Sequence, residues 1–342
     1  MDRRTFLLSS ASSASAFMAS GLIPPMLPRQ PRSEAKRFPV IPHERLLKML
    51  NPPTDRGEVL LDTDTDNEID DQFALAYALL SRDRLDLKAI CAAPFHNNRS
   101  RDAADGMEQS YQEINRVQQM LPESLRVPAF RGSRQFLSSE TEPVRSPAAE
   151  LLVEMAEHTG TAPLYVSAIG TLTNVASAIL IKPEIIHKIV VVWTSAYPHT
   201  WHRPNRSFNL QQDLHAARVT LDSGVPLVYL PGFYVGEELR VTLPEVRQYL
   251  RGHGLLGDYL YEIYENYFND HFGRSKVIWD LINVAWLIHP GWVPSDIYHT
   301  PELLDDLRWG PQDDRRPVMR EAHDVDRDAV FSDFYRKVQQ LA

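Results

Sequence analysis

The chain of 342 residues contains one cysteine, Cys91, so an intrachain disulfide framework is excluded. Cys91 lies in the apolar run Leu87–Ala93, which is typical of a core residue and not of a nucleophile. Positive charge is also scarce: the net charge is −9, which argues against nucleic acid as a partner. With 43% hydrophobic and 24% charged residues, the composition indicates a globular protein with a large core.

The N-terminal region lacks an apolar run suited to a stable membrane span, because residues 8–23 are rich in serine and alanine. The preceding Met1-Asp2-Arg3-Arg4-Thr5-Phe6-Leu7 resembles a twin-arginine export signal, and a proline-rich, basic linker follows. We therefore expect residues 1–37 to be signal and linker, and residues 38–342 to form a single catalytic domain. The protein would be periplasmic or secreted; an uncleaved membrane anchor is the alternative.

The most informative stretch runs from Asp62 to Asp71, where five aspartates and one glutamate occur in ten residues. The apolar run Val59–Leu61 precedes it and Phe73–Leu80 follows, which predicts a buried strand, an acidic loop and a helix. In open α/β sheets, such loops at the carboxyl ends of strands bind ligands. Crowded carboxylates repel one another unless a cation compensates, and Ca²⁺ prefers all-oxygen sites. The stretch therefore predicts a metal site.

Two known acidic loops do not fit this stretch. An EF-hand loop needs glycine where Asn67 stands and a bidentate glutamate where Phe73 stands. The phosphotransferase pattern Asp-x-Asp-x-Thr fails because Asp66 occupies the hydroxyl position. The metal site must therefore belong to another class of protein.

Further along the chain, strand-like apolar runs alternate with helical patterns. This alternation predicts an open, mostly parallel α/β sheet flanked by helices. Expected strands cover residues 58–61, 85–93, 163–169, 188–196 and 225–231, and expected helices include residues 42–50, 103–119, 148–158 and 255–272.

The acidic stretch resembles the Asp-x-Asp-Pro-Gly-x-Asp-Asp signature of nucleoside hydrolases. Asp62 and Asp64 match the first pair and Asp70-Asp71 the second, with two extra residues between. Counting back from Asp70 instead selects Asp64 and Asp66. We prefer the first register, because the strand must end directly at the first aspartate.

Two further blocks carry the same resemblance in the same order. Gly170-Thr171-Leu172-Thr173-Asn174-Val175-Ala176 is similar to the family's Gly-Pro-Leu-Thr-Asn-Ile-Ala, and Trp279-Asp280 begins a block similar to its His-Asp-Ala helix. The stretch from Asn205 to Ala217 resembles its Glu-Phe-Asn segment. The chain thus resembles a divergent, exported branch of the inosine-uridine preferring nucleoside hydrolases, with their Rossmann-like core.

The resemblance implies a calcium-dependent hydrolase that cleaves the N-glycosidic bond of ribonucleosides, or of a related ribosyl conjugate, by metal-activated water. Asp64 would take the proton from that water. Homo-oligomers are common in the family, so one is possible here. The implied metal ligands are Asp62, Asp64, Asp71, Asp280 and the carbonyl of Ile169. The implied substrate-binding residues are Asp70, Asn97, Asn98, Asn209 and Trp279.

Two departures from the family pattern leave the substrate open. Ser207 replaces the glutamate that holds the ribose 5′-hydroxyl, and Trp279 replaces the histidine that helps to protonate the departing base. These changes favour the alternative of a calcium-dependent sugar- or nucleoside-binding protein without turnover. The sequence leaves five candidates for a substitute acid: Asp66, Glu68, His96, His199 and His202.

Overall fold

The structure is a computed structural model that describes residues 38–341. The predicted export signal and linker, residues 1–37, lie outside the described residues, so this assignment stays a prediction. Within the described range, none of the helices is both long and apolar enough to cross a membrane.

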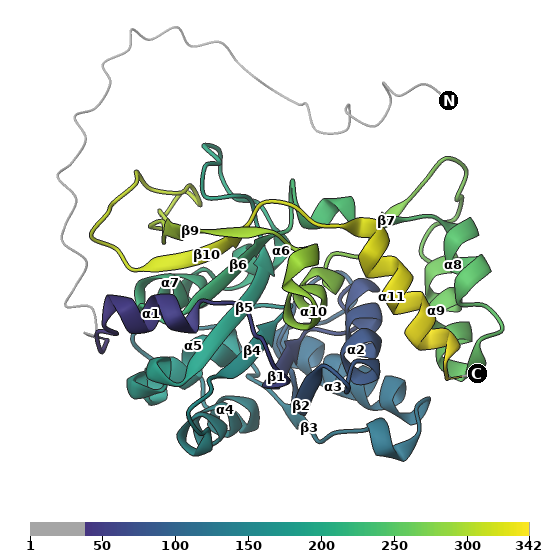
Figure 1. The fold of residues 1–342 in the computed structure, drawn as a ribbon, viewed down its shortest axis with the longest axis horizontal. Coiled ribbons are helices and arrows are strands. Elements are labelled where there is room, and N and C mark those ends of the chain that lie inside the picture. The colour runs from purple at the N-terminus through teal and green to yellow at the C-terminus, as the bar shows by residue number, and fades with distance from the viewer. Residues whose placement is uncertain (1–37, 342) are drawn as a thin grey trace, which may run out of the picture. The chain divides into compact units, whose positions relative to one another are not determined.

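An eight-stranded sheet with the order β3-β2-β1-β4-β5-β6-β10-β9 lies at the centre of the fold (Figure 1). Neighbouring strands run parallel, apart from the antiparallel pair β10 and β9 at one edge. This arrangement confirms the predicted open, mostly parallel α/β sheet. The strands are β1 (Gly57–Thr63), β2 (Leu85–Ala92), β3 (Ala129–Arg131), β4 (Leu164–Ala168), β5 (Ile189–Ser195), β6 (Leu227–Pro231), β9 (Ser295–His299) and β10 (Val318–Ala322); β7 (Arg240–Val241) and β8 (Lys276–Val277) form a separate antiparallel pair.

Helices cover the sheet in two groups (Figure 1). Helices α4, α5 and α7 pack against one another in one group, while α2, α3, α10 and α11 make up the other. The helices are α1 (His43–Met49), α2 (Asp70–Leu80), α3 (Ala103–Gln119), α4 (Pro147–His158), α5 (Thr173–Ile181), α6 (Phe208–Gln212), α7 (Leu214–Asp222), α8 (Leu243–Tyr249), α9 (Gly254–Glu265), α10 (Leu281–Ile288) and α11 (Arg327–Gln339).

The core lies on both faces of the central strands. Every residue of β4 and β5 is buried, as expected for parallel strands that have helices on both sides. Helix α2 is buried on nearly all sides, because α10 and α11 cover it; the rings of Phe73 and Phe334 pack with their centres 5.7 Å apart. The start of α2 is therefore held firmly within the fold.

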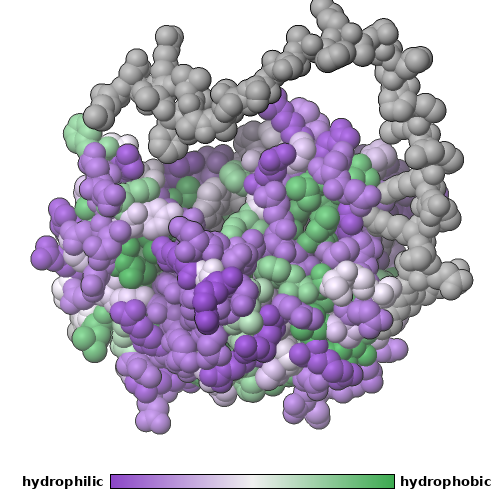
Figure 2. Space-filling model, turned by 180° about the vertical axis from the view of Figure 1, so that it is seen from behind, coloured by the Kyte–Doolittle hydropathy of each residue, from purple (hydrophilic) through white to green (hydrophobic). Residues whose placement is uncertain are grey.

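The face shown in Figure 2 is mainly hydrophilic, with small scattered apolar areas.

Among the element boundaries that differ from the sequence-based expectation, two affect the site. Strand β1 continues through Asp62 to Thr63, because the backbone of Thr63 still pairs with β2 and its oxygen accepts a hydrogen bond from Ala93. Helix α9 ends at Glu265 and not at Phe272: the backbone of Tyr267 donates to the carbonyl of Tyr264, three residues back, and a ring nitrogen of His271 lies 2.8 Å from the carbonyl oxygen of Glu265. The last carbonyls of the helix are thus satisfied by the loop and not by a further helical turn.

The chain changes direction between β1 and β4. From β1 it proceeds through β2 to β3 at one edge, whereas from β4 it proceeds through β5 and β6 toward the other. The backbone of Ile169 donates a hydrogen bond to the carbonyl of Asp62 at 2.9 Å, so the ends of β4 and β1 lie side by side. Crevices at such switch points are where open α/β sheets bind ligands.

Candidate metal and substrate site

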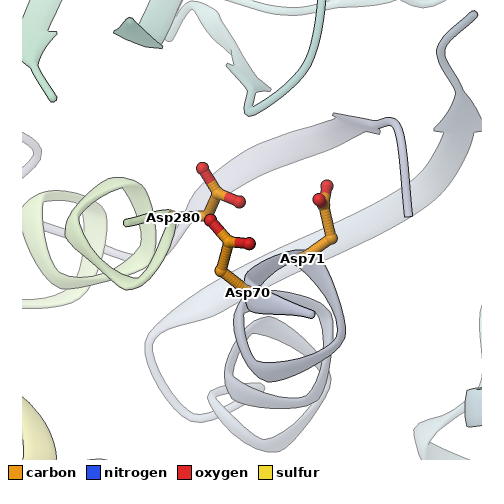
Figure 3. A group of neighbouring side chains, drawn as sticks. All are labelled: Asp70, Asp71 and Asp280. Atoms are coloured by element: carbon orange, nitrogen blue, oxygen red, sulfur yellow. The ribbon is translucent and has the colours of Figure 1, made fainter. Parts of the chain in front are cut away.

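Three buried carboxyl groups converge at the carboxyl edge of the sheet. Asp70 and Asp71 begin α2, and Asp280 immediately precedes α10. One carboxylate oxygen from each lies within 4.8 Å of the others, and Figure 3 shows all three groups pointing to the same side. The starts of two helices stabilise negative charge through their dipoles, but they do not neutralise three carboxylates. The arrangement therefore suits a divalent cation.

Asp64 and Asp62 lie next to this cluster and are also fully buried. Among the residues that the structure describes, neither side-chain oxygen of Asp64 has a hydrogen-bond partner, and Oδ2 of Asp62 lacks one as well. The other oxygen of Asp62 accepts a hydrogen bond from Asn174 Nδ2 at 2.8 Å. Buried carboxylate oxygens without partners are rare and costly. These oxygens are therefore available to a metal ion.

Burial and mutual repulsion alter the pKa values of the five aspartates. Burial raises the pKa of Asp62 to about 7 and that of Asp64 to about 8. Burial, followed by repulsion from Asp64 and Asp70, raises the pKa of Asp71 well above its usual range, and that of Asp280 shifts in the same direction. The pKa of Asp70 is also raised by burial, although Lys276 counteracts the shift. Without a cation, the cluster cannot be fully ionised near neutral pH.

The carbonyl oxygen of Ile169 completes the predicted donor set. Ile169 follows β4 and lines a cavity at this edge of the sheet, and its carbonyl accepts a hydrogen bond from Asn209 Nδ2 at 2.8 Å. The neighbouring Gly170 allows this turn to approach Asp64, since an added Cβ would lie 2.8 Å from Asp64 Oδ1. A carbonyl oxygen has two lone pairs, so Ile169 can still act as a ligand.

A cavity of about 510 Å³ opens above these residues. Its size is that of a site for a small molecule. Asp62, Asp64 and Asp71 do not line it and lie below its surface. The structure brings together at its wall all the residues predicted to bind substrate, Asp70, Asn97, Asn98, Asn209 and Trp279, together with the predicted ligands Ile169 and Asp280.

One wall of the cavity is aromatic and includes Phe233 beside the predicted Trp279. The ring of Phe233 meets Trp279 edge to face at 5.4 Å between ring centres. Tyr197 stacks on Phe233 at 4.2 Å and on Trp201 at 4.6 Å, so a stack of three rings supports this wall from behind. Such a wall favours a planar group over a purely polar one.

The structure also distinguishes the two registers of the acidic loop. Asp66 does not line the main cavity, has φ +90° and lies 3.7 Å from Arg99 in an exposed ion pair. Asp62 and Asp64, in contrast, are buried beside the cluster. The geometry therefore favours the register that pairs Asp62 and Asp64.

Most candidates for a leaving-group acid lie outside the cavity. Glu68 lines it, but its carboxylate is engaged by Lys276, whose Nζ donates to it at 2.6 Å. His199 lies 2.9 Å from the carboxylate of Glu321. The candidates that do not line the cavity are Asp66, His96, His199 and His202.

Sequence reasoning missed three further residues at or near the cavity: Lys276, Arg99 and Phe233. Lys276 lies four positions before Asp280, directly before the apolar Val277-Ile278-Trp279, so its closeness to a predicted ligand could have drawn attention to it. Arg99 and Phe233 follow β2 and β6, where the chain has no motif that marks them.

Comparisons with known proteins agree with this geometry. A model of the family described as inosine-uridine preferring nucleoside hydrolase matches residues 59–332. The non-specific ribonucleoside hydrolase RihC of Salmonella schwarzengrund is 26% identical over 248 residues, which cover 66% of this chain and 78% of that protein. The RihC protein of Klebsiella pneumoniae is 27% identical over 164 residues, and the match spans 51% of its length.

Solved structures show the same fold. A purine-preferring ribonucleoside hydrolase from Gardnerella vaginalis has a TM-score of 0.67 at 20% identity, covering 83% of this chain and 98% of that one. A plant nucleoside hydrolase has a TM-score of 0.66 at 18% identity, covering 83% and 99%. Since the family model extends over most of the chain, this protein belongs to the inosine-uridine preferring nucleoside hydrolase family, among the N-glycosyl hydrolases.

Proposed function

We propose that this protein is a calcium-dependent hydrolase that cleaves the N-glycosidic bond of ribonucleosides or of a related ribosyl conjugate. The observation that carries this proposal is the convergence of Asp70, Asp71 and Asp280 beneath a cavity lined by polar and aromatic residues. Membership of the family supports the reaction class.

The residues present fit a hard divalent cation. All available donors are oxygens, and both side-chain oxygens of Asp64 are buried without a partner. Ca²⁺ accepts six to eight such ligands, including carboxylates and backbone carbonyls. When bound, the ion would polarise a water molecule and orient the sugar hydroxyls. The residues that would hold it are Asp62, Asp64, Asp71, Asp280 and the carbonyl of Ile169.

The side chains around the cavity have separate tasks in this proposal. Asp64 takes the proton from the attacking water, because both of its side-chain oxygens are buried beside the cluster and neither has a hydrogen-bond partner among the residues that the structure describes. Asp70 and Asn209 hold the 2′- and 3′-hydroxyls of the ribose. The buried carboxylates also stabilise the positive charge that develops on the sugar in an oxocarbenium-like transition state.

The substrate's leaving group would lie against the aromatic wall formed by Trp279 and Phe233. Asn97 and Asn98 follow β2 and line the cavity near the acidic loop, since Asn97 Nδ2 donates to the carbonyl of Asn67 at 3.0 Å. They would contact the sugar. This division gives the cavity an aromatic part for the leaving group and a polar part for the ribose.

The test is release of reducing sugar from purine and pyrimidine nucleosides, with and without EDTA. Turnover that is lost with EDTA and in Asp64→Ala would support the proposal. Absence of turnover on every nucleoside, with calcium still bound, would contradict it.

The alternative is a calcium-dependent protein that binds a nucleoside or sugar without cleaving it. One observation favours it: the Ser207 hydroxyl, at the position of the family's glutamate, lies 2.9 Å from Ser195 Oγ and accepts a hydrogen bond from Ala196 N at 3.0 Å. Ser207 therefore uses part of its hydrogen-bonding capacity on protein groups, and it offers no carboxylate to a 5′-hydroxyl. A ribose-dependent rise in melting temperature without turnover would support this alternative.

We further propose that the protein belongs to a divergent branch exported through the twin-arginine route to the periplasm or beyond. The Arg3-Arg4 segment supports this proposal. Fusion of residues 1–37 to a reporter that is active only after export tests it, with Arg3→Lys/Arg4→Lys as the control. A homo-oligomer, as in many members of the family, is tested by light scattering.

A further inference from the structure

Lys276 lies beside the acidic cluster, although the proposed chemistry does not require a fixed ammonium there. Its side chain is 7% exposed, and Nζ donates to Glu68 Oε2 at 2.6 Å and to the carbonyl of Val277 at 2.9 Å. The same nitrogen lies 3.6 Å from Asp70 Oδ1 and 5.3 Å from the centre of the Tyr267 ring. Burying an ammonium group is costly unless charge and hydrogen bonds compensate. Here four neighbours provide that compensation.

The ammonium group pairs with one of the three converging carboxylates and not with the others. Among the residues that the structure describes, Asp70 forms an ion pair with a basic side chain, whereas neither Asp71 nor Asp280 does so. Asp71 instead accepts a hydrogen bond from the Thr63 hydroxyl at 2.6 Å. An arriving cation would therefore compete with Lys276 at Asp70 only.

Glu68 holds the ammonium group in this position. It belongs to the acidic loop that is two residues longer than the family pattern, and its second oxygen accepts a hydrogen bond from the Tyr267 hydroxyl at 3.1 Å. Arg99 donates to the backbone carbonyl of Glu68 at 3.3 Å and so fixes the same loop. The longer loop thus provides the partner that keeps Lys276 next to Asp70.

We propose that Lys276 is a positioning residue that divides the acidic cluster between metal and substrate. It keeps Asp70 available to the sugar hydroxyls and lowers the affinity of Asp71 and Asp280 for a divalent cation by adding positive charge nearby. This inference rests on the proposed function. Removing the ammonium group would free Asp70 to join the metal ligands, so metal would bind more tightly and sugar more weakly.

The experiment compares Lys276→Met and Lys276→Arg with the unaltered chain. Calcium affinity is measured by isothermal titration calorimetry, and KM and kcat are measured with inosine and uridine. For Lys276→Met we expect calcium to bind about threefold to tenfold more tightly and KM to rise about tenfold, with a smaller change in kcat. Lys276→Arg, which keeps the charge, should recover most of both values.

Lys337→Met is the matched control. Lys337 in α11 is also largely buried, with a side chain 13% exposed, and lies 3.2 Å from Asp83 Oδ1, away from the cavity. This variant should leave calcium affinity and KM unchanged. It measures the effect on the stability of the fold when a partly buried lysine outside the cavity is lost.

The opposite signs of the two effects distinguish positioning from simple support of the fold. If Lys276→Met weakens calcium and substrate binding together, or changes neither, the proposal is overturned. If the unaltered protein hydrolyses no nucleoside, the proposed function fails separately. Calcium titration and the ribose-induced shift in melting temperature then replace the kinetics. Tighter calcium binding by Lys276→Met, together with a smaller ribose-induced shift than in the unaltered chain, supports the inference. Any other combination overturns it.

Discussion

The side-chain amide of Asn209 donates to the carbonyl oxygen of Ile169 at 2.8 Å, which joins the start of α6 to the turn after β4. Both groups line the cavity, so Asn209 contacts a predicted metal ligand while it faces the substrate. Its loss should therefore affect metal and sugar together.

For Asn209→Ala we expect kcat/KM to fall about 10- to 100-fold, because a partly buried hydrogen bond is removed and the carbonyl of Ile169 loses this donor, which costs about 1–3 kcal/mol. Steady-state kinetics on the best nucleoside measure this effect. Asn115→Ala is the control, since Asn115 also donates to a backbone carbonyl, that of Tyr111 at 2.7 Å, but does not line the cavity. A loss below about threefold would contradict the role of Asn209.

Gly170→Ala should disrupt the metal site without changing any of its ligands. The added Cβ would lie 2.8 Å from Asp64 Oδ1 and would push the carboxylate out of place. We expect a loss of activity of at least about 100-fold and weaker calcium binding in calorimetry, since small displacements of catalytic groups are expensive. Gly160→Ala is the matched control, because a Cβ there meets nothing within 4 Å. Equal activity of the two variants would argue against Asp64 as the proton acceptor.

Trp279→Ala should weaken binding of the leaving group. Loss of one aromatic surface costs about 1–3 kcal/mol, so KM should rise about 5- to 100-fold, more for purine than for pyrimidine nucleosides because purines stack over a larger area. Trp292→Ala serves as the control: Trp292 stacks on His289 outside the cavity. An unchanged KM for every nucleoside would remove Trp279 from the substrate site.

Removal of calcium should destabilise the protein more at pH 8 than at pH 5. Burial raises the pKa of Asp62 to about 7 and of Asp64 to about 8 in the folded, metal-free state, against about 3.9 when unfolded. Between these values the folded state binds more protons, so its stability falls as pH rises from about 4 to 8. A bound cation removes this penalty by stabilising the ionised carboxylates.

Thermal melts with EDTA and with excess Ca²⁺ at several pH values test this prediction. The difference in melting temperature should be small at pH 5 and should widen by about 5 °C or more at pH 8. The variant Asp64→Asn, which does not titrate at that position, should show a weaker pH dependence with EDTA. A difference that stays constant from pH 5 to 8 would exclude the aspartates as its source.

The strand, acidic loop and helix from Val59 to Leu80 could be predicted from the sequence, because an apolar run is followed directly by acidic residues and then by a second apolar run. The carbonyl of Ile169 was implied only by the resemblance to the family, and the structure places it directly after β4, before Gly170. For the acidic stretch, the local sequence pattern and the position in the fold agree, because ligand sites in open α/β sheets form at the carboxyl ends of the strands.

The contact between Lys276 and Glu68 could not be predicted. Lys276 and Glu68 are 208 residues apart, and a pair of charges carries no local periodicity. Helix α9 was expected to continue to Phe272, because its aromatic residues repeat at helical spacing, yet it ends at Glu265. The chain after Glu265 is no longer helical and places Tyr267 at the cavity, where its hydroxyl contacts Glu68.

The predicted metal ligands come from segments that are far apart in the chain, near residue 70 and at residue 280. In the unfolded chain these segments are separated by a long loop, whose closure costs conformational entropy. A cation that binds both would act as a reversible cross-link that exists only in the folded state. Such a link should slow unfolding and protect the protein from proteases, and both effects should increase with the concentration of free calcium. Calcium supply would then set the lifetime of the protein as well as its activity.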